Sequence, residues 1–219
     1  MKGIVLDAGR YRPLESGHFA RFSERFQVQI HNCSHFGYTV RKGAVLLQRM
    51  LERGNGGEVA LLEYGGNDCD FDWKAVAQNP EGEFDPKTPP EEFCALYADL
   101  VRGLQKRGVT VALMTLPPID AERYLHWVAS GEQERKNILR WLGDVQRIYR
   151  FQEMYSGLVA RVAAETGALL ADVRTSFLQR RDTGALLCGD GIHPNAAGHQ
   201  LLFDTLCDFG ERHLCRLKG

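Results

Sequence analysis

The chain has 219 residues, 44% of them apolar, so it can bury one sizeable core and we expect a single domain over residues 1–219. Lysine and arginine number 27 against 28 aspartates and glutamates, and this balance argues against binding of nucleic acid or of an anionic membrane surface. No apolar run approaches the ~20 residues that cross a bilayer, and the first residues lack the layout of a secretory signal. We therefore expect a soluble, cytoplasmic protein.

Four short apolar runs have the continuous pattern of buried parallel strands. In chain order they are VQIHN from Val28, VALLEY from Val59, VTVALMTL from Val109 and ALLADV from Ala168. Segments with helical spacing separate them. Because parallel strands need crossover connections, this alternation predicts an α/β fold with a mostly parallel sheet. Ligands of such sheets bind outside the carboxyl ends of the strands, so the loops after these runs are the candidates for a site.

Helices are predicted by apolar residues at i, i+3 and i+4. One begins near Thr39, and a second covers 90–108, where Pro90 suits the first turn and Gly108 the end. A third covers 145–165 and is followed by Gly167, and the last begins at residue 196 and closes the chain.

Two longer connections interrupt this pattern. Residues 79–93 are rich in Pro, Gly and acidic side chains and predict a surface loop. Residues 117–144 predict a helical insertion over the end of the sheet, where Trp127 and Trp141 either line a substrate entrance or pack a helical hairpin. We favour packing for both tryptophans.

The six cysteines are scattered without a Cys-x-x-Cys pair, and a chain of this size folds without disulfides, so we expect free thiols. A structural zinc site needs four N or S ligands, usually in close pairs. We expect neither a metal nor another cofactor. The cysteines are Cys33, Cys69, Cys94, Cys188, Cys207 and Cys215.

The run VALLEY leads into Gly65 and Gly66 and then into Asn67 and Asp68. Two glycines let the backbone turn sharply and expose the next side chain. An asparagine amide at this point is a donor that can meet an anionic oxygen. A plain turn, in which Asn67 and Asp68 bond their own backbone, stays open as the structural alternative.

The stretch DGIHPN, directly before the last helix, holds Asp190 and His193 three residues apart. At this spacing the carboxylate can accept a hydrogen bond from one ring nitrogen of His193 and leave the other free to take a proton. A metal site with His199 or Cys188 as further ligands is a second interpretation. A turn in which Asp190 caps backbone amides is a third.

A further glycine, Gly37, lies between the run from Val28 and the helix near Thr39. A backbone N–H at such a junction points toward the strand ends and is a ready donor to an anion. Glycines of this kind are common without function, so Gly37 is a candidate site residue only because the other two motifs are also present.

These stretches, in this order, resemble blocks of the SGNH hydrolases, also called GDSL esterases or lipases. Gly37 matches the glycine of the second block, Asn67 in GGND the asparagine of the third, and Asp190 with His193 the Asp-x-x-His of the fifth. GGNDCDFDW, LPPIDAERY and NILRWLGD also look like signature stretches of one bacterial subgroup, so the resemblance spans essentially the whole chain. It implies a flavodoxin-like three-layer α/β/α sandwich.

The chain departs from that family at the first block, where the family carries Gly-Asp-Ser and its nucleophile. In one alignment Leu6-Asp7-Ala8 is the remnant of the block, with GIVL as the strand and Ala8 in place of serine. In the other, which we favour, MKGIVLD follows the block, and the strand with its serine lies upstream of Met1. Neither Ser16 nor Ser34 lies on an element that suits the role.

The resemblance implies a serine hydrolase acting on small-molecule esters with short acyl or O-acetyl groups. In it Asp190 orients His193, His193 acts as the general base, and Gly37 with Asn67 forms the oxyanion hole. A catalytically inactive module that binds an acyl ester or a carbohydrate is the alternative. A metal hydrolase is a third, and the oligomeric state is left open.

Overall fold

Three parallel strands form the central sheet of the computed structural model, which describes residues 4–7, 9–14, 17–52 and 57–214. The strands are β3 (Val59–Leu62), β4 (Thr110–Met114) and β5 (Leu169–Ala171), in the order β3-β4-β5. Val59 pairs with Thr110, and Ala112 pairs with Leu169. Each strand lies within an apolar run that the sequence predicted. The middle strand is the most buried, because the side chains of residues 111–114 are almost completely covered.

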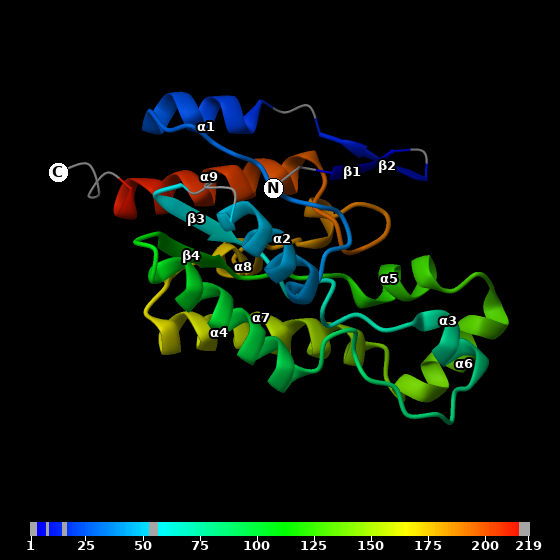
Figure 1. Cartoon of the computed structure of the whole chain (residues 1–219). Coiled ribbons are helices and arrows are strands. Elements are labelled where there is room, and N and C mark those ends of the chain that lie inside the picture. The colour runs from blue at the N-terminus through cyan, green and yellow to red at the C-terminus, as the bar shows by residue number, and fades with distance from the viewer. Residues whose placement is uncertain (1–3, 8, 15–16, 53–56, 215–219) are drawn as a thin grey trace.

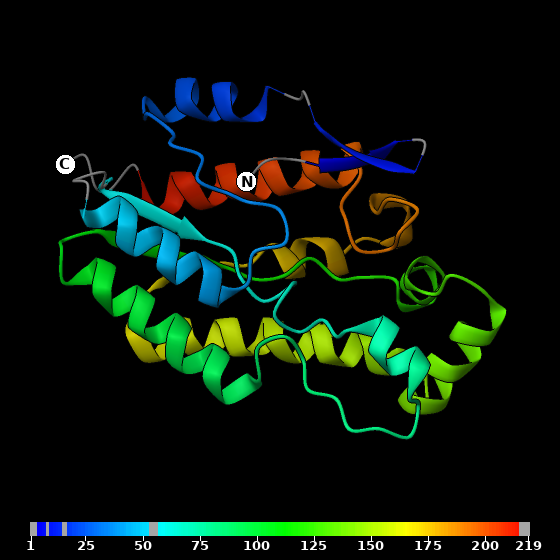
Figure 2. The same ribbon diagram turned by 45° about the vertical axis from the view of Figure 1, so that its right-hand side comes forward.

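Helices cover both faces of the sheet (Figures 1 and 2). One face carries α2 (Val40–Glu52), α4 (Pro90–Gln105) and α7 (Gln146–Thr166), and the other carries α1 (His18–Phe26), α8 (Val173–Leu178) and α9 (Ala196–His213). The predicted α/β sandwich with a parallel sheet is therefore confirmed, as are the helices predicted at 90–108, 145–165 and 196 onward. The helix expected near Thr39 begins at Val40.

The predicted insertion at 117–144 is helical, with α5 (Ala121–Val128) and α6 (Glu132–Leu142). These helices, with α3 (Trp73–Gln78), form a second apolar cluster at one end of the molecule (Figure 1). Asp120 begins α5 by accepting a hydrogen bond from the Arg123 N–H at 3.0 Å. Aspartates cap α3 and α8 in the same way, so short polar side chains define these helix starts.

The predicted strand at Val28 is wrong. Residues 28–32 have no regular secondary structure, and only Val28 and Ile30 of this run are apolar, so the run is less apolar than those that form β3 and β5. A strand requires a neighbour about 4.8 Å away to complete its hydrogen bonds. Val28, Ile30 and β3 instead line one cavity, which lies between the two segments.

The amino-terminal segment forms a hairpin rather than a strand of the parallel sheet. β1 (Ile4–Asp7) pairs antiparallel with β2 (Arg10–Pro13), with Leu6 opposite Tyr11. The Leu6 N–H also lies 3.4 Å from the Cys188 sulfur, which fixes the hairpin near the carboxyl-terminal loop. Of the residues in the two alignments of the first block, residues 1–3 and Ala8 lie outside the described residues.

A turn of 3₁₀ helix at Gly184–Leu186 (η1) completes the elements. Among the helices of the described residues, none is long and apolar enough to cross a membrane. Five of the cysteines are free thiols, and the sixth, Cys215, lies outside the described residues.

Candidate active site

Asp190 and His193 form a hydrogen-bonded pair in the loop that leads into α9. His193 Nδ1 lies 2.7 Å from Asp190 Oδ2. The other carboxylate oxygen, Oδ1, accepts the N–H groups of Ile192 at 3.0 Å and of His193 at 3.1 Å. Asp190 is completely buried, whereas about a quarter of the His193 side chain is exposed. The pair thus holds Nδ1 toward the carboxylate and leaves Nε2 on the open side of the ring.

The carboxylate of Asp190 is stabilised in its ionised form. Burial raises the pKa of Asp190, but hydrogen bonds from the His193 ring and from the N–H groups of Ile192 and His193 outweigh burial, so the pKa lies below its usual value. An ionised Asp190 can fix the orientation of the imidazole and stabilise the imidazolium that forms when Nε2 takes a proton.

This lowered pKa makes a prediction about acid stability. Because the folded pKa is below the unfolded value of about 3.9, ionised Asp190 stabilises the fold above that pH and loses this contribution as pH falls through the folded pKa. The difference in free energy of unfolding between wild type and Asp190→Asn should therefore shrink from pH 7 to pH 3 in urea titrations. A difference that stays constant would contradict the pKa assignment. Asp99→Asn, on the exposed face of α4, is the control.

Asp68, next to Asn67, has a structural role. Its buried carboxylate accepts the N–H groups of Val40 at 2.9 Å and Gly65 at 3.0 Å and the Thr88 hydroxyl at 2.7 Å. Burial raises the pKa of Asp68, and these hydrogen bonds oppose that effect. Asp68 therefore joins the start of α2, the turn after β3 and the loop before α4, whose conformations together position Asn67.

We expect Asp68→Ala to lower the free energy of unfolding by about 3 kcal/mol or more, because it leaves two buried N–H groups and one hydroxyl without their acceptor. Urea denaturation measures this change. Asp72→Ala removes one exposed helix cap and should cost only about 1 kcal/mol. Equal losses for the two variants would contradict the structural role of Asp68.

Asn67 is exposed, and its Nδ2 donates to the Tyr38 carbonyl at 3.2 Å. A primary amide has two N–H donors, so one stays available after this bond has fixed the side chain. Tyr38 directly follows Gly37, which has a left-handed φ of 72°. The Asn67–Tyr38 bond thus joins the GGND motif to the segment that carries Gly37.

Gly37, Asn67 and His193 line one cavity of about 2280 Å³. Phe36, which precedes Gly37, also stacks on His193 with ring centres 5.7 Å apart, and Asn67 bonds the carbonyl of Tyr38, which follows Gly37, so a series of contacts links the three predicted motifs. Their catalytic roles stay predictions.

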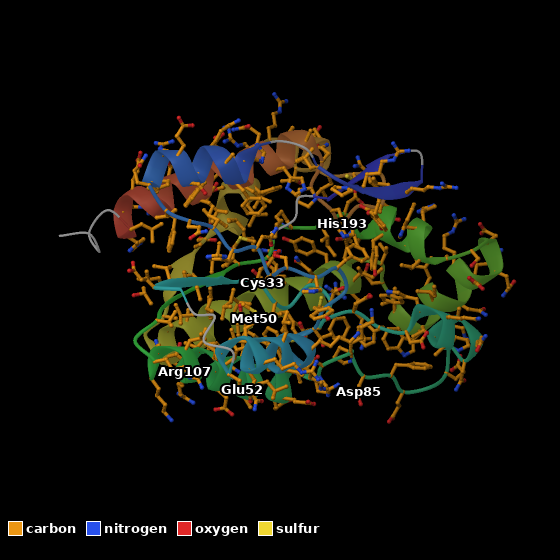
Figure 3. All side chains as sticks on the ribbon, turned by 45° about the horizontal axis from the view of Figure 1, so that its top comes forward. Cys33, Met50, Glu52, Asp85, Arg107 and His193 are labelled. Atoms are coloured by element: carbon orange, nitrogen blue, oxygen red, sulfur yellow. The ribbon has the colours of Figure 1, made fainter. Side chains whose placement is uncertain are left out.

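Sequence reasoning missed Tyr11, which contacts the pair directly. Its hydroxyl donates to Asp190 Oδ2 at 3.0 Å, and its ring lies 4.9 Å from the His193 ring. Burial, followed by the charge of Asp190 and this hydrogen bond, raises the pKa of Tyr11, so the phenol stays a donor at neutral pH. In Figure 3 His193 lies beside the β1–β2 hairpin that carries Tyr11. Nothing in the local sequence pattern marks this tyrosine.

Two exposed aromatic side chains extend this contact surface. Phe36, 60% exposed, stacks on His193 with ring centres 5.7 Å apart. Trp127, 42% exposed, lies edge-on to Tyr11 at 6.0 Å and lines the cavity. Trp141 instead packs against Phe71. The prediction that both tryptophans pack within the helical insertion is therefore confirmed for Trp141. It is wrong for Trp127, which lies near the end of α5 and is exposed at the cavity.

Neither the Cys188 sulfur nor Ser34 is hydrogen-bonded to the Asp190–His193 pair through its side chain in the described part of the chain. No group of three or more His, Cys, Asp or Glu side chains that could hold a metal occurs among the residues the structure describes. Cys188 instead bonds the Pro194 carbonyl. Ser34 lines the cavity, but no hydrogen bond links it to His193 in the described part of the chain. Ser16 lies outside it.

Comparison with models of protein families matches residues 8–201 to the one described as the GDSL-like Lipase/Acylhydrolase family. Comparison with curated proteins found no match. Among solved structures, LAE5, an alpha/beta hydrolase enzyme from the metagenome of Lake Arreo, Spain, is 27% identical over 88% of this chain and 77% of its own, with a TM-score of 0.59.

Two other solved structures show the same fold at lower identity. A lipase/acylhydrolase from Enterococcus faecalis is 16% identical over 95% of this chain and 89% of its own, with a TM-score of 0.63. The acetyl xylan esterase AlAXEase is 20% identical over 89% of this chain and 91% of its own, with a TM-score of 0.60.

Proposed function

Because this chain belongs to the GDSL-like lipase/acylhydrolase family, we propose that it is an ester hydrolase for short acyl or O-acetyl groups on carbohydrate or lipid alcohols. The observation that carries the proposal is the 2.7 Å pair of His193 Nδ1 and Asp190 Oδ2 beside a cavity that Asn67 and Gly37 also line. A base, its orienting carboxylate and two donors for an oxyanion are the groups that acyl transfer requires.

In the proposed reaction, His193 Nε2 takes the proton of a serine hydroxyl as that oxygen attacks the ester carbonyl. The tetrahedral oxyanion accepts hydrogen bonds from the free Asn67 amide N–H, from the Gly37 N–H and from the N–H of the serine. The imidazolium then gives its proton to the leaving alcohol, and water cleaves the acyl-enzyme by the same route. Asp190, with the hydrogen bond from Tyr11, keeps the ring oriented throughout.

Among the described residues, no serine side chain is hydrogen-bonded to His193, so the serine in this scheme is not one of them. We propose that the Leu6-Asp7-Ala8 segment does not take the place of the nucleophile block, because β1 pairs with β2 and not with β3. Without that serine, His193 could only activate water directly. Serine hydrolases that lose a triad member keep a rate only ~10³–10⁴-fold above that of the uncatalysed reaction.

The 219-residue chain is therefore expected to show almost no hydrolysis of p-nitrophenyl acetate and no labelling by a fluorophosphonate probe, which reacts only with an activated serine. Ala8→Ser discriminates between the two alignments: we expect it to stay inactive. Strong hydrolysis by the unaltered chain that His193→Ala abolishes would overturn the assignment of the nucleophile. Activity gained by Ala8→Ser would favour the other alignment.

A catalytically inactive module that binds an acyl ester or a carbohydrate is the second candidate. The observation that favours it is again the absence of a serine contact to His193 in the described part of the chain. Calorimetric titration with glucose pentaacetate separates the candidates: binding by a form that carries the serine, without turnover or probe labelling, would support the binding module over the hydrolase.

A further inference from the structure

The aromatic side chains around His193 form one continuous surface, supplied by three separate parts of the chain. Tyr11 belongs to β2, Phe36 to the loop before α2, and Trp127 to the last turn of α5. The Tyr11 ring contacts both of the others, with its centre 5.3 Å from that of Phe36 and 6.0 Å from that of Trp127. It also meets the His193 ring at 4.9 Å. We call Tyr11, Phe36 and Trp127 the aromatic surface.

Two members of the aromatic surface are unusually exposed. Phe36 is 60% exposed, which is the largest value for a large apolar side chain among the described residues, and Trp127 is 42% exposed. Aromatic area left in water forgoes the free energy that its burial would give. Contiguous exposed apolar surface is typical of a binding site. Its position beside His193 therefore indicates that the aromatic surface contacts a ligand of the candidate active site.

The contact with His193 assigns this ligand to the alcohol half of an ester. In acyl transfer the imidazolium gives its proton to the leaving alcohol, so the alcohol oxygen must lie within hydrogen-bonding distance of His193 Nε2. The acyl carbonyl oxygen instead meets Asn67 and the N–H of Gly37. Because Tyr11 and Phe36 contact the His193 ring itself, a group bound on the aromatic surface belongs to the alcohol. This step rests on the proposed function.

The arrangement of the rings selects a class of alcohol. Tyr11 packs directly against both other rings, so the three form a surface and do not enclose a space for a quaternary ammonium group. A pyranose ring is rigid and carries apolar C–H groups on its faces, whose weakly positive hydrogens are attracted to the negative face of an aromatic ring. A flexible glycerol lipid has no such face and loses more conformational entropy when it binds.

An ion pair in the same cavity supplies polar partners for a sugar. Asp70 and Lys87 both line the cavity, and Lys87 Nζ lies 2.7 Å from Asp70 Oδ2. Asp70 Oδ1 accepts the Tyr124 hydroxyl at 2.8 Å, and Tyr124 lies on α5 about one turn before Trp127. The carboxylate is therefore held against the helix that carries Trp127. It offers an acceptor and the ammonium group offers donors to sugar hydroxyls, which a hydrocarbon chain cannot use.

We propose that the aromatic surface binds a pyranose ring, which is the alcohol part of an acylated sugar, and that Asp70 and Lys87 bond its hydroxyl groups. Carbohydrate esters, and not lipid esters, are then the substrates within the proposed function. A sugar stacked on Phe36 and Trp127 can present its esterified oxygen to His193 Nε2. The binding of the sugar itself needs neither a nucleophile nor hydrolysis, so the 219-residue chain is sufficient to test it.

An NMR titration of the full chain with methyl β-D-glucopyranoside tests the proposal through the indole N–H signals, assigned with Trp→Phe variants. We expect the signal of Trp127 to shift saturably. The signal of Trp141, which packs against Phe71, should not move. Sorbitol is the matched control ligand, because it carries hydroxyl groups on an open chain and has no rigid apolar face. It should give no saturable shift.

Trp127→Ala should weaken glucoside binding by about tenfold or more, measured by saturation transfer to the glucoside protons. Trp127→Phe keeps an aromatic face and should restore part of the affinity. Phe36→Ala removes the other exposed ring and should have a similar effect, independently of α5. His126→Ala is the matched control and should bind like wild type, since His126 is an exposed neighbour on α5 that does not line the cavity.

Three results would overturn the proposal. They are the absence of a saturable Trp127 shift with the glucoside, an equal shift with sorbitol, and unchanged binding by both alanine variants of the aromatic surface. Tighter binding of benzyl alcohol or of choline than of the glucoside would also contradict it, and would identify an aromatic or a cationic alcohol as the ligand.

Failure of this proposal is distinguishable from failure of the proposed function. In a form that carries the serine, ester hydrolysis without glucoside binding would remove the sugar site and leave the hydrolase standing. Glucoside binding at Trp127 without hydrolysis would do the reverse, because the site for the sugar would be shown and the proposed reaction would not.

Discussion

Replacing Gly191 by alanine is expected to lower the free energy of unfolding by about 3 kcal/mol or more and to separate His193 from Asp190. Gly191 has a φ of 76°, in the left-handed region that costs other residues energy. A Cβ atom there would also lie 2.6 Å from the Asp120 carbonyl oxygen and 3.1 Å from the Tyr124 nitrogen. Both are backbone atoms at the start of α5, which cannot move aside cheaply, so the loop itself must shift.

The shift would act on the candidate active site because Gly191 lies between Asp190 and His193. The Asp120 N–H donates to the Gly191 carbonyl at 2.8 Å, and this bond joins the loop to α5. Urea denaturation measures the stability loss, and the downfield NMR signal of the His193 Nδ1 proton, which reports its hydrogen bond to Asp190, should weaken or disappear.

Gly189→Ala is the matched control, because Gly189 lies in the same loop and a Cβ atom added there would meet no atom within 4 Å. It should leave both measurements nearly unchanged. Similar effects for the two glycines would mean that the loop responds to any added methyl group, and would contradict the specific role of the contact with α5.

The sheet could be predicted wherever a strand has its partners. VALLEY, VTVALMTL and ALLADV became β3, β4 and β5 because each pairs with at least one of the others. The run at Val28 was grouped with them although only Val28 and Ile30 are apolar, and it forms no strand. Composition reports the tendency of a segment to be buried, whereas strand formation also depends on a neighbouring edge within hydrogen-bonding distance. A single sequence contains no direct signal for that neighbour.

The sequence predicted those parts of the site whose residues lie close together in the chain. Asp190 and His193 are three residues apart, and one loop conformation, with Gly191 at its turn, brings them into contact. Asn67 and Gly37 follow predicted apolar runs, so the rule that ligands bind outside strand ends placed them near the same point. Asp68 was grouped with Asn67, but its side chain turns inward, because its carboxylate oxygens accept hydrogen bonds from three separate segments.

Tyr11 shows what the sequence could not provide. Its contact with Asp190 spans 179 positions and comes from a hairpin that packs over the carboxyl-terminal loop. The pattern of residues 9–14 specifies neither the partner of that hairpin nor its direction. Trp127 is a similar case, because exposure at the cavity depends on where α5 ends and not on the residues around the tryptophan.

In a form that carries the serine nucleophile, Asn67→Ala should lower kcat by about 10²–10³ and change KM little, because the lost N–H serves the oxyanion more than the ground-state carbonyl. The bond from Asn67 Nδ2 to the Tyr38 carbonyl orients the amide before the substrate arrives, so the donor needs no rearrangement during the reaction. Steady-state kinetics with p-nitrophenyl acetate separates kcat from KM.

Asn32→Ala is the control for this variant, since Asn32 lines the same cavity but uses its side-chain oxygen on the Ser34 N–H. It should retain most of the activity. If Asn67→Ala raised KM and left kcat intact, the amide would bind substrate and transition state equally, and the proposed oxyanion hole would lose its side-chain donor. If kcat falls strongly for Asn67→Ala but not for Asn32→Ala, negative charge must develop within hydrogen-bonding distance of the Asn67 amide. That charge would form in the cavity that Asn67 and His193 both line.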